Sequence, residues 1–276
     1  MSIPSELKSS LRPLTTSAFE DLSNGLMNWS LWARMGWLEV KRRYRRTVIG
    51  PFWSAVSLAI MVGAVGAIGS ALWKQDPFEY LPFLASGLVV WMLISSITIA
   101  SCGLFVNSST LFRQMRFDYS ILVYSLVWRN FIVFLHNLTV YVVILVLMAP
   151  QQINFNILLV APGMLALLIN GVWIALLLGL ICLRFRDILQ LINSLIQIAM
   201  FVTPIFWPLN ALENSARVVF VHFNPLYHLI TIVRDPLIGK IPPSEVYLAV
   251  AVITVCGWAL TYVVFERFRK RIVYWS

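Results

Sequence analysis

Charged side chains are scarce in this chain of 276 residues. Asp, Glu, Lys and Arg together make up 12% of the sequence, whereas an ordinary soluble domain contains about 25%. Six apolar stretches contain no Asp or Glu, and each has roughly the 20 residues that a helix needs to cross a bilayer. They span approximately residues 52–73, 81–106, 121–148, 157–182, 188–206 and 246–265. The sequence therefore predicts an all-α integral membrane protein with six transmembrane helices.

The missing carboxylates also limit how such a protein could be powered. Transporters coupled to protons or sodium usually place Asp or Glu inside the membrane, so ion coupling is disfavoured here. The sequence GxxxxGK[ST] is absent as well, so the chain has no P-loop of its own with which to bind ATP. Energy for transport against a gradient is expected from another protein.

Cysteine is too sparse and scattered to suggest a disulfide or a metal centre. Cys102, Cys182 and Cys256 lie in or at the ends of different apolar stretches, without a CxxC pair or a histidine at ligand spacing. We interpret them as small packing residues, and we expect no metal or cofactor on this chain.

The N-terminal segment has neither the apolar core nor the cleavage site of a signal peptide, so it is expected to remain attached. Residues 1–18 are rich in Ser, Thr and Pro and are predicted to form a mobile cytoplasmic tail. Residues 19–276 are predicted to form a single transmembrane domain. Ser17 and Glu20 have the spacing of a capping box, which predicts a helix start.

Apolar residues recur at helical spacing over residues 19–40, with tryptophans among them. This pattern predicts an amphipathic helix lying in the membrane interface. A helix packed on another protein segment is the alternative. Gly50-Pro51 follows and should bend the chain into the first span, because the residue before a proline avoids helical dihedral angles.

Basic residues are distributed unevenly between the two sides of the predicted bundle. The chain has 21 Lys and Arg and a net charge of +9, and all but five of these residues fall before, between or after spans on the side of the termini. The positive-inside rule therefore predicts that both termini are cytoplasmic. The densest group is expected to anchor the membrane surface and attract anionic lipids rather than nucleic acid; it consists of Lys41, Arg42, Arg43, Arg45 and Arg46.

The segment between the fifth and sixth spans is apolar but is interrupted by prolines. Runs of this length are typical of re-entrant or interfacial segments. Asn224-Pro225 has the pattern of an N-cap followed by proline at the first helical position. We predict two short helices, roughly 209–221 and 225–235, that enter from the outer face.

Polar residues form stripes along two of the predicted spans. They are expected to face the bundle interior or a water-filled path, because polar groups in hydrocarbon need partners. Hydrogen bonds between helices explain them equally well, and Arg129 has the further option of extending toward the cytosol. The residues assigned to this set are Arg129, His136, Asn137, Gln190, Asn193 and Gln197.

No catalytic constellation is recognisable. The candidates on the outer side are Glu213, His222, His228 and Asp235. Their spacing matches no hydrolase or transferase pattern, so the chain is not expected to be an enzyme.

Three sequence segments together resemble a known family. They are YRRTVIGPFW before the first span, NSSTLFRQMRFD after the second and FNPLYHLITIVRDPLIG before the sixth. Over about residues 29–270 the chain is similar to the polysaccharide-export branch of the type-two ABC permeases. The resemblance implies a homodimer that pairs with two copies of a cytosolic ABC ATPase, which binds ATP and Mg, and that exports lipid-linked polysaccharides such as O antigens, capsules or teichoic acids.

The resemblance also assigns roles to particular residues. The interfacial helix would lie against the ATPase, and the segment 107–118 would be the coupling helix, unless it is simply a solvated loop. The coupling candidates are Asn107, Arg113, Gln114, Arg116 and Asp118. The implied outer gate includes Asn224, Pro225, Tyr227 and Arg234.

Aromatic residues are candidates for stacking on sugar rings if they face a channel, and otherwise anchor helices or fill the core. They include Trp91, Tyr124, Trp128, Tyr141 and Trp173. The expected function is that of a permease in the bacterial inner membrane that exports a lipid-linked polysaccharide. A drug or small-lipid exporter of the same architecture and a membrane-embedded transferase acting on a lipid-linked sugar are the alternatives.

Overall fold

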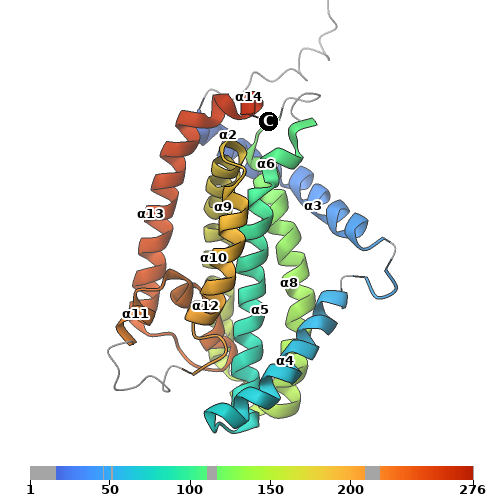
Figure 1. Cartoon of the computed structure of the whole chain (residues 1–276), viewed down its shortest axis with the longest axis vertical. Helices are drawn as coiled ribbons and strands as arrows, with labels where there is room; N and C mark the ends of the chain where they lie inside the picture. Colours follow the sequence, from blue (N-terminus) through green and yellow to red (C-terminus); the bar gives the residue numbers. More distant parts are fainter. Residues whose placement is uncertain (1–16, 46, 51, 111–116, 209–217, 276) are drawn as a thin grey trace, which may run out of the picture.

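The structure is a computed structural model that describes residues 17–45, 47–50, 52–110, 117–208 and 218–275 (Figure 1). Within these ranges all regular secondary structure is helical. The longer helices are α2 (Ala18–Met27), α3 (Trp29–Arg43), α4 (Phe52–Trp73), α5 (Pro77–Cys102), α8 (Ser120–Met148), α9 (Val160–Arg184), α10 (Ile188–Val202), α12 (Pro225–Leu237) and α13 (Ser244–Phe268). The short ones are α6 (Leu104–Asn107), η1 (Pro150–Gln152), η2 (Phe155–Leu159), α11 (Val218–His222), η4 (Arg269–Arg271) and α14 (Ile272–Trp275).

Five helical segments in the described part of the chain are long and apolar enough to cross a membrane. They are Phe52–Trp73, Pro77–Cys102, Ser120–Met148, Phe155–Arg184 and Ser244–Arg271. The prediction of an all-α membrane protein is therefore confirmed. The second segment begins four residues before the predicted 81, because Asp76 caps it by accepting a hydrogen bond from the Phe78 N–H at 3.0 Å and proline occupies its first position.

The helix in the place of the predicted fifth span is shorter than expected. α10 has 15 residues, which corresponds to about 22 Å at 1.5 Å per residue. It ends at Val202 because Thr203 precedes Pro204 and takes extended dihedral angles, φ −83° and ψ 137°. The structure thus gives five long spans and one shorter apolar helix.

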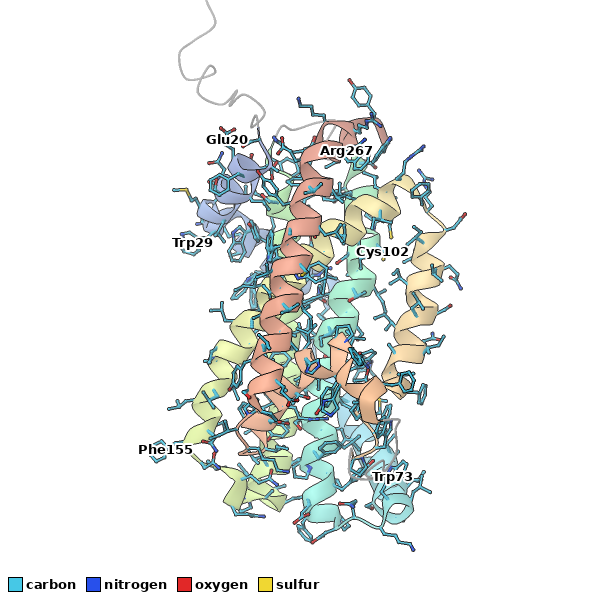
Figure 2. All side chains as sticks on the ribbon, turned by 90° about the vertical axis from the view of Figure 1, so that its left-hand side faces the viewer. Glu20, Trp29, Trp73, Cys102, Phe155 and Arg267 are labelled. Carbon is cyan, nitrogen blue, oxygen red and sulfur yellow. The ribbon has the colours of Figure 1, made fainter. Side chains whose placement is uncertain are left out.

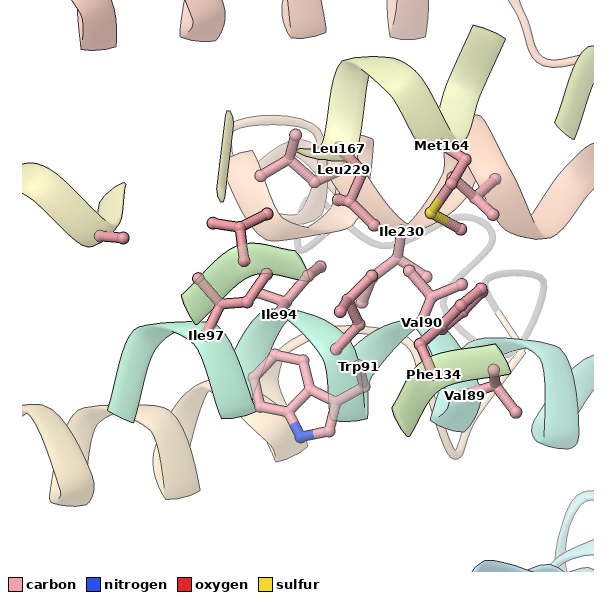
Figure 3. Close-up of a cluster of buried hydrophobic side chains, with 14 of the residues drawn as sticks. Val89, Val90, Trp91, Ile94, Ile97, Phe134, Met164, Leu167, Leu229 and Ile230 are labelled. Atoms are coloured by element: carbon pink, nitrogen blue, oxygen red, sulfur yellow. The ribbon is translucent and has the colours of Figure 1, made fainter. Parts of the chain in front are cut away.

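The core of the bundle is built around α5, which packs against α4, α8, α9, α10 and α12. Figure 3 shows side chains of α5, α8, α9 and α12 meeting there. The labelled members of this cluster are Val89, Val90, Trp91, Ile94, Ile97, Phe134, Met164, Leu167, Leu229 and Ile230. All are buried, so α5 is the element around which the other spans are ordered.

Small residues on α4 form two rows with different surroundings. Gly66 and Gly69 face α5, where a Cβ on Gly69 would lie 2.3 Å from the Tyr80 hydroxyl and one on Gly66 would lie 3.1 Å from Leu81. Gly63 belongs to the other row, which is exposed, and a Cβ at this position would meet no atom within 4 Å. One row is therefore used for packing within this chain and the other is left on its surface.

The predicted interfacial helix 19–40 is divided into α2 and α3 at Asn28, which has non-helical dihedral angles. Ser17 caps α2 by accepting a hydrogen bond from the Glu20 N–H at 3.2 Å, as the capping-box pattern predicts. Both helices pack on α8 at glycines: a Cβ on Gly25 would overlap Ser120, and one on Gly36 would lie 2.9 Å from the Ser125 carbonyl oxygen. The opposite faces of α2 and α3 expose large apolar residues. Each helix therefore packs on α8 with one face and leaves the other exposed.

α12 begins at Pro225 as predicted but continues beyond 235 to Leu237. Pro236 lies inside it and cannot donate a hydrogen bond to the carbonyl of Ile232, four residues back. That carbonyl faces Gly163 of α9, where a Cβ would lie only 2.6 Å from the oxygen. The first predicted short helix, 209–221, is seen only as α11, because residues 209–217 lie outside the described ranges.

A buried carboxylate joins the two ends of the chain. Asp21, with 1% of its surface exposed, accepts hydrogen bonds from the backbone N–H groups of Tyr119 and Ser120 at 3.2 and 2.9 Å. Its carboxylate also lies 3.3 Å from Nε of Arg269. A carboxylate at a helix N-terminus is favourable because the backbone N–H groups there lack intrahelical partners. Asp21 therefore connects α2, the start of α8 and η4.

We expect Asp21→Asn to destabilise the protein strongly. An amide cannot accept both backbone hydrogen bonds and removes the negative charge beside Arg269, and breaking a buried pair typically costs about 3–5 kcal/mol. The measurement is the thermal unfolding temperature of the full chain in detergent, followed by circular dichroism.

Asp187→Asn is the matched control, because Asp187 is exposed and makes no side-chain hydrogen bond to the start of α10. Its unfolding temperature should remain close to that of the wild type. Equal changes in the two variants would contradict the role given to Asp21.

Candidate functional site

The candidate site residues are located relative to the two ends of the bundle. α2 and α14 lie together at one end, here called the termini end (Figure 1). Glu20 and Arg267 are at this end, and Trp73 and Phe155 are at the opposite end (Figure 2). The candidate coupling segment 107–118 leaves from α6 and returns at α8, both at the termini end.

Asn107 and Asp118 are the described members of the coupling set. Asn107 closes α6, and the Asp118 carbonyl accepts a hydrogen bond from the Ile121 N–H at 3.1 Å at the start of α8. Arg113, Gln114 and Arg116 lie outside the described residues. The structure thus places the two ends of the segment side by side in the region where α3 joins the bundle.

The basic surface group follows the end of α3. Lys41, Arg42 and Arg43 form its last turn, and their side chains are exposed, as is that of Arg45. Arg46 lies outside the described residues. Basic side chains in the last turn of a helix also complement its dipole.

Arg129 pairs with a residue that the sequence interpretation did not identify. Its Nη1 donates a hydrogen bond to Oε2 of Glu39 on α3, and the two side chains are 18% and 28% exposed. Glu39 is the only acidic residue of α3. This lone carboxylate was the sequence feature from which a partner for Arg129 could have been predicted. The pair ties α3 to α8.

A cavity of about 450 Å³ adjoins this ion pair. Besides the two charged partners, its polar wall includes Arg42, Asn107 and Ser108. The cavity therefore extends from the Glu39–Arg129 pair to the start of the candidate coupling segment.

His136 and Asn137 lie where α8 crosses α4. Oδ1 of Asn137, a 2% exposed residue, accepts a hydrogen bond from the Ser54 hydroxyl at 2.9 Å. The Nδ1 atom of His136 lies 2.7 Å from the Ile132 carbonyl oxygen, and its ring meets Phe52 edge-on. These contacts join two helices of the same chain.

The polar stripe of α10 has different surroundings. Gln190 and Gln197 are exposed and Asn193 is half-buried, and α10 has no buried residue. Within the described ranges no hydrogen bond is formed by these three side chains. Gln190 and Gln197 therefore face away from the rest of this chain, and Asn193 lies at the edge of the packed side of α10.

Two of the outer-gate candidates hold α12 in place. Asn224 caps the helix, with Oδ1 accepting from the Leu226 N–H at 3.0 Å, and its Nδ2 donates to the Thr203 hydroxyl at 2.9 Å. Pro225 occupies the first helical position. The Tyr227 ring packs edge-on against the ring of His228.

Arg234, the remaining gate candidate, is 6% exposed and is held from several directions. Its Nη1 donates to the Pro204 carbonyl at 2.7 Å, and its guanidinium lies 4.6 Å from the centre of the Phe83 ring, a cation–π geometry. Its Nε is 3.7 Å from the Asp235 carboxylate. Burial raises the pKa of Asp235 above its usual range, while the Arg234 guanidinium acts in the opposite direction.

Two of the five candidate stacking aromatics are buried and the other three are half-buried. Trp91 and Tyr141 are buried, and the Tyr141 hydroxyl donates a hydrogen bond to the Leu237 carbonyl. Tyr124 donates to the Leu22 carbonyl at 3.0 Å, and Trp173 donates to Asn170 at 2.8 Å. These rings fill contacts between helices.

Comparison with known proteins identifies the architecture. Residues 30–238 match the family model described as ABC-2 type transporter. This match covers about three quarters of the chain, including α3 to α12. The chain belongs to the ABC-2 type transporter family. As a member of this family with several long apolar helices, it is a multi-pass membrane protein and a transporter membrane subunit.

This ABC-2 transporter chain is similar to proteins named O-antigen export system permeases. An O-antigen export system permease protein, RfbA, of Myxococcus xanthus is 23% identical over 219 residues, covering 79% of this chain and 84% of the relative. RfbA proteins of Klebsiella pneumoniae are 23% identical over 235 residues, covering 84% of this chain and 88% of the relatives. The similarity thus extends over most of each protein.

We expect Glu39→Gln and Arg129→Gln each to lower the thermal unfolding temperature of this ABC-2 subunit, because each leaves one partly buried charge unpaired. The exchanged variant Glu39→Arg/Arg129→Glu should recover most of the loss. The coupling energy should be about 1 kcal/mol, since the pair is partly exposed to solvent. It is measured by a double-mutant cycle.

Lys41→Gln provides the comparison, because Lys41 is exposed two residues further along α3. It should leave the unfolding temperature nearly unchanged. Strictly additive effects of the two Gln substitutions would show that the ion pair contributes nothing.

Proposed function

We propose that this chain is the membrane subunit of an ATP-driven exporter that moves a lipid-linked polysaccharide from the cytoplasmic to the outer face of the bacterial inner membrane. The observation that carries the proposal is the match to the ABC-2 family over residues 30–238, together with near full-length similarity to O-antigen export permeases. The missing P-loop in the sequence supports a separate ATPase that binds ATP and Mg.

The termini end is proposed to be the cytoplasmic end. It carries the exposed basic turn that ends α3 and the basic run of η4. Clusters of Lys and Arg next to a span favour the cytoplasmic side and attract anionic lipids. Both termini would then lie in the cytoplasm.

α10 is proposed to complete a set of six crossings. α2 and η4 meet through Asp21 and Arg269 at one end, and an odd number of crossings would leave them at opposite ends. α10 starts close after Arg184, at the end of α9, and stops near Phe206, whose carbonyl accepts a hydrogen bond from Tyr80 near the start of α5. It therefore runs between the two ends of the bundle.

α11 and α12 are proposed to be re-entrant helices at the outer end. Both lie between the end of α10 and the start of α13. α12 is nevertheless well inside the bundle, because Arg234 contacts the Phe83 ring of α5 and the Leu237 carbonyl is bonded to Tyr141 of α8. The segment would enter and leave the membrane at the same end. Broken helices are tolerated at membrane depth where protein covers them, and α12 is covered in this way.

A second copy of the chain is proposed to cover the polar face of α10. Exposed Gln190 and Gln197 on an apolar helix would be unfavourable against lipid tails, so they favour a protein partner or a water-filled path. The exposed small residues of α4 would allow a close approach of another helix. A path between two copies also suits a long polymer better than a closed pocket in one.

Energy is proposed to reach the permease through α2, α3 and the segment 107–118, whose two described ends join α6 and α8 at the termini end. Arg113, Gln114 and Arg116 would contact acidic residues of the ATPase, with Asn107 and Asp118 at the ends of the segment. Charge complementarity of this kind favours correct docking.

We expect the double variant Arg113→Glu/Arg116→Glu to fold normally and to lose export. Reversed charge would repel the acidic surface of the ATPase, so ATP-dependent movement of lipid-linked polysaccharide in proteoliposomes containing both subunits should fall to background. Folding is checked by the unfolding temperature and by gel filtration.

Arg184→Glu/Arg186→Glu is the matched control, since these exposed arginines lie at the end of α9 and just after it and should leave export largely intact. Normal export by the Arg113/Arg116 variant would refute the coupling assignment. Failure of the wild-type complex to move polysaccharide while it moves a small amphiphile would favour a drug or small-lipid exporter.

The proposed dimer is tested by single cysteines. In a variant without the native cysteines, Gln197→Cys should form a disulfide-linked dimer on mild oxidation in membranes, because α10 would face its copy. Leu248→Cys on the exposed face of α13 should remain monomeric on denaturing gels. The same yield of cross-linked dimer from both would argue against this interface.

A further inference from the structure

A second cavity lies at the end of the molecule opposite the termini end. It has a volume of about 600 Å³ and is called the outer cavity here. Its walls come from the start of α5, from η1, and from the end of α12 with the turn that follows. The side chains that line the outer cavity include Gln75, Glu79, Phe83, Gln152, Arg234 and Lys240.

The polar lining of the outer cavity distinguishes it from a void left by imperfect packing. Three glutamine side chains line it, Gln75, Gln151 and Gln152, and each amide both donates and accepts hydrogen bonds. The rings of Tyr80 and Phe83 form part of its wall. A few polar groups converging beside aromatic surface in a space of this size are the usual features of a small-molecule site.

Charge in the outer cavity is balanced. Glu79 and Asp235 supply two negative charges, and Arg234 and Lys240 supply two positive ones. The guanidinium of Arg234 is already engaged by the Pro204 carbonyl and the Phe83 ring, with the Asp235 carboxylate beside it. An anion such as phosphate needs uncompensated donors, so the charge distribution favours a neutral, polyhydroxylated ligand.

One buried polar atom supports a ligand. Oε1 of Gln152 is inaccessible to solvent and has no hydrogen-bond partner within the described part of the chain. Arg234 is more than nine-tenths buried and lines the cavity. Buried polar groups normally have partners, and a ligand hydroxyl could supply one for the Gln152 oxygen once the amide turns toward the cavity.

The walls are held in position by glycine and asparagine. Gly239 has φ +79°, and a Cβ there would lie 2.6 Å from the Gln152 carbonyl oxygen. Its own carbonyl accepts hydrogen bonds from Nδ2 of Asn154 and of Asn156, each at 2.8 Å. The turn that carries Lys240 is thereby fixed against the segment that carries Gln152, so the site is preorganised.

We propose that the outer cavity binds a neutral mono- or disaccharide unit of the exported glycan. Sugar hydroxyls both donate and accept hydrogen bonds, as the glutamine amides do, and the carboxylate of Glu79 accepts from them. The sugar as ligand follows from the lining; its source in the exported polymer rests on the proposed function. The cavity would hold the glycan where it leaves the bundle on the outer side.

The test uses the full chain in lipid nanodiscs and saturation-transfer NMR, with maltose and cellobiose as probes. At least one of these neutral disaccharides should receive saturation from the wild-type protein. The double variant Glu79→Gln/Gln151→Ala changes two exposed side chains, so folding should be preserved. Its affinity for the probe should fall by about tenfold, the effect of losing one hydrogen bond to a charged group.

Glu245→Gln is the matched control, because Glu245 is exposed in the first turn of α13 and does not line the outer cavity. It should bind the probe as the wild type does. The proposal is overturned if neither disaccharide receives saturation, if the double variant binds as well as the control, or if inorganic phosphate displaces the bound sugar.

Failure of this proposal and failure of the proposed function are distinguishable. Sugar binding that follows the predicted variant pattern, in a complex that moves no polysaccharide, would leave the cavity assignment standing and refute the exporter. Export without sugar binding in the outer cavity would do the reverse.

Discussion

The need to pair polar groups away from water determines much of this structure. In hydrocarbon a backbone or side-chain polar atom has no solvent partner, so it must find one in the protein. Asn137 meets this need through Ser54 of α4, and Arg129 meets it through Glu39 of α3. The polar side chains of α10 are an exception to this pairing. Gln190, Asn193 and Gln197 of α10 form no side-chain hydrogen bond in the described ranges, and α10 is an apolar helix without a buried residue.

The same constraint connects the surface helices to the spans. Asp21 fastens α2 to the first turn of α8 and to Arg269, and the Glu39–Arg129 pair fastens α3 to the middle of α8. Glycines at positions 25 and 36 allow these helices to approach α8 closely. α2, α3 and α8 therefore form a single mechanical unit at the termini end. A displacement applied to the surface helices is passed to a helix that extends to the opposite end.

Fold class was predictable because apolar length and the scarcity of charge are local properties of the sequence. The start of α12 was predictable for a similar reason, since Asn224 and Pro225 act on neighbouring backbone groups. The pairs of residues that contact each other across helices were not predictable. Arg129 and Glu39 are 90 residues apart and Asp21 and Ser120 are 99 apart, and no local pattern links them. The length of α10 was overestimated because its apolar composition continues beyond Thr203, where the dihedral restriction before Pro204 ends the helix.

The way α12 is held has a consequence for opening at the outer end. Its N-cap Asn224 is bonded to Thr203, and the Arg234 side chain in its last turn is bonded to the Pro204 carbonyl. The carbonyl of its last residue, Leu237, is bonded to Tyr141, and Gly163 lies against its backbone at Ile232. A helix with contacts to the chain along its whole length cannot swing like a hinged flap without breaking all of them. An aperture at this end would then widen by rigid-body separation of whole subunits, with α12 carried along as part of the wall.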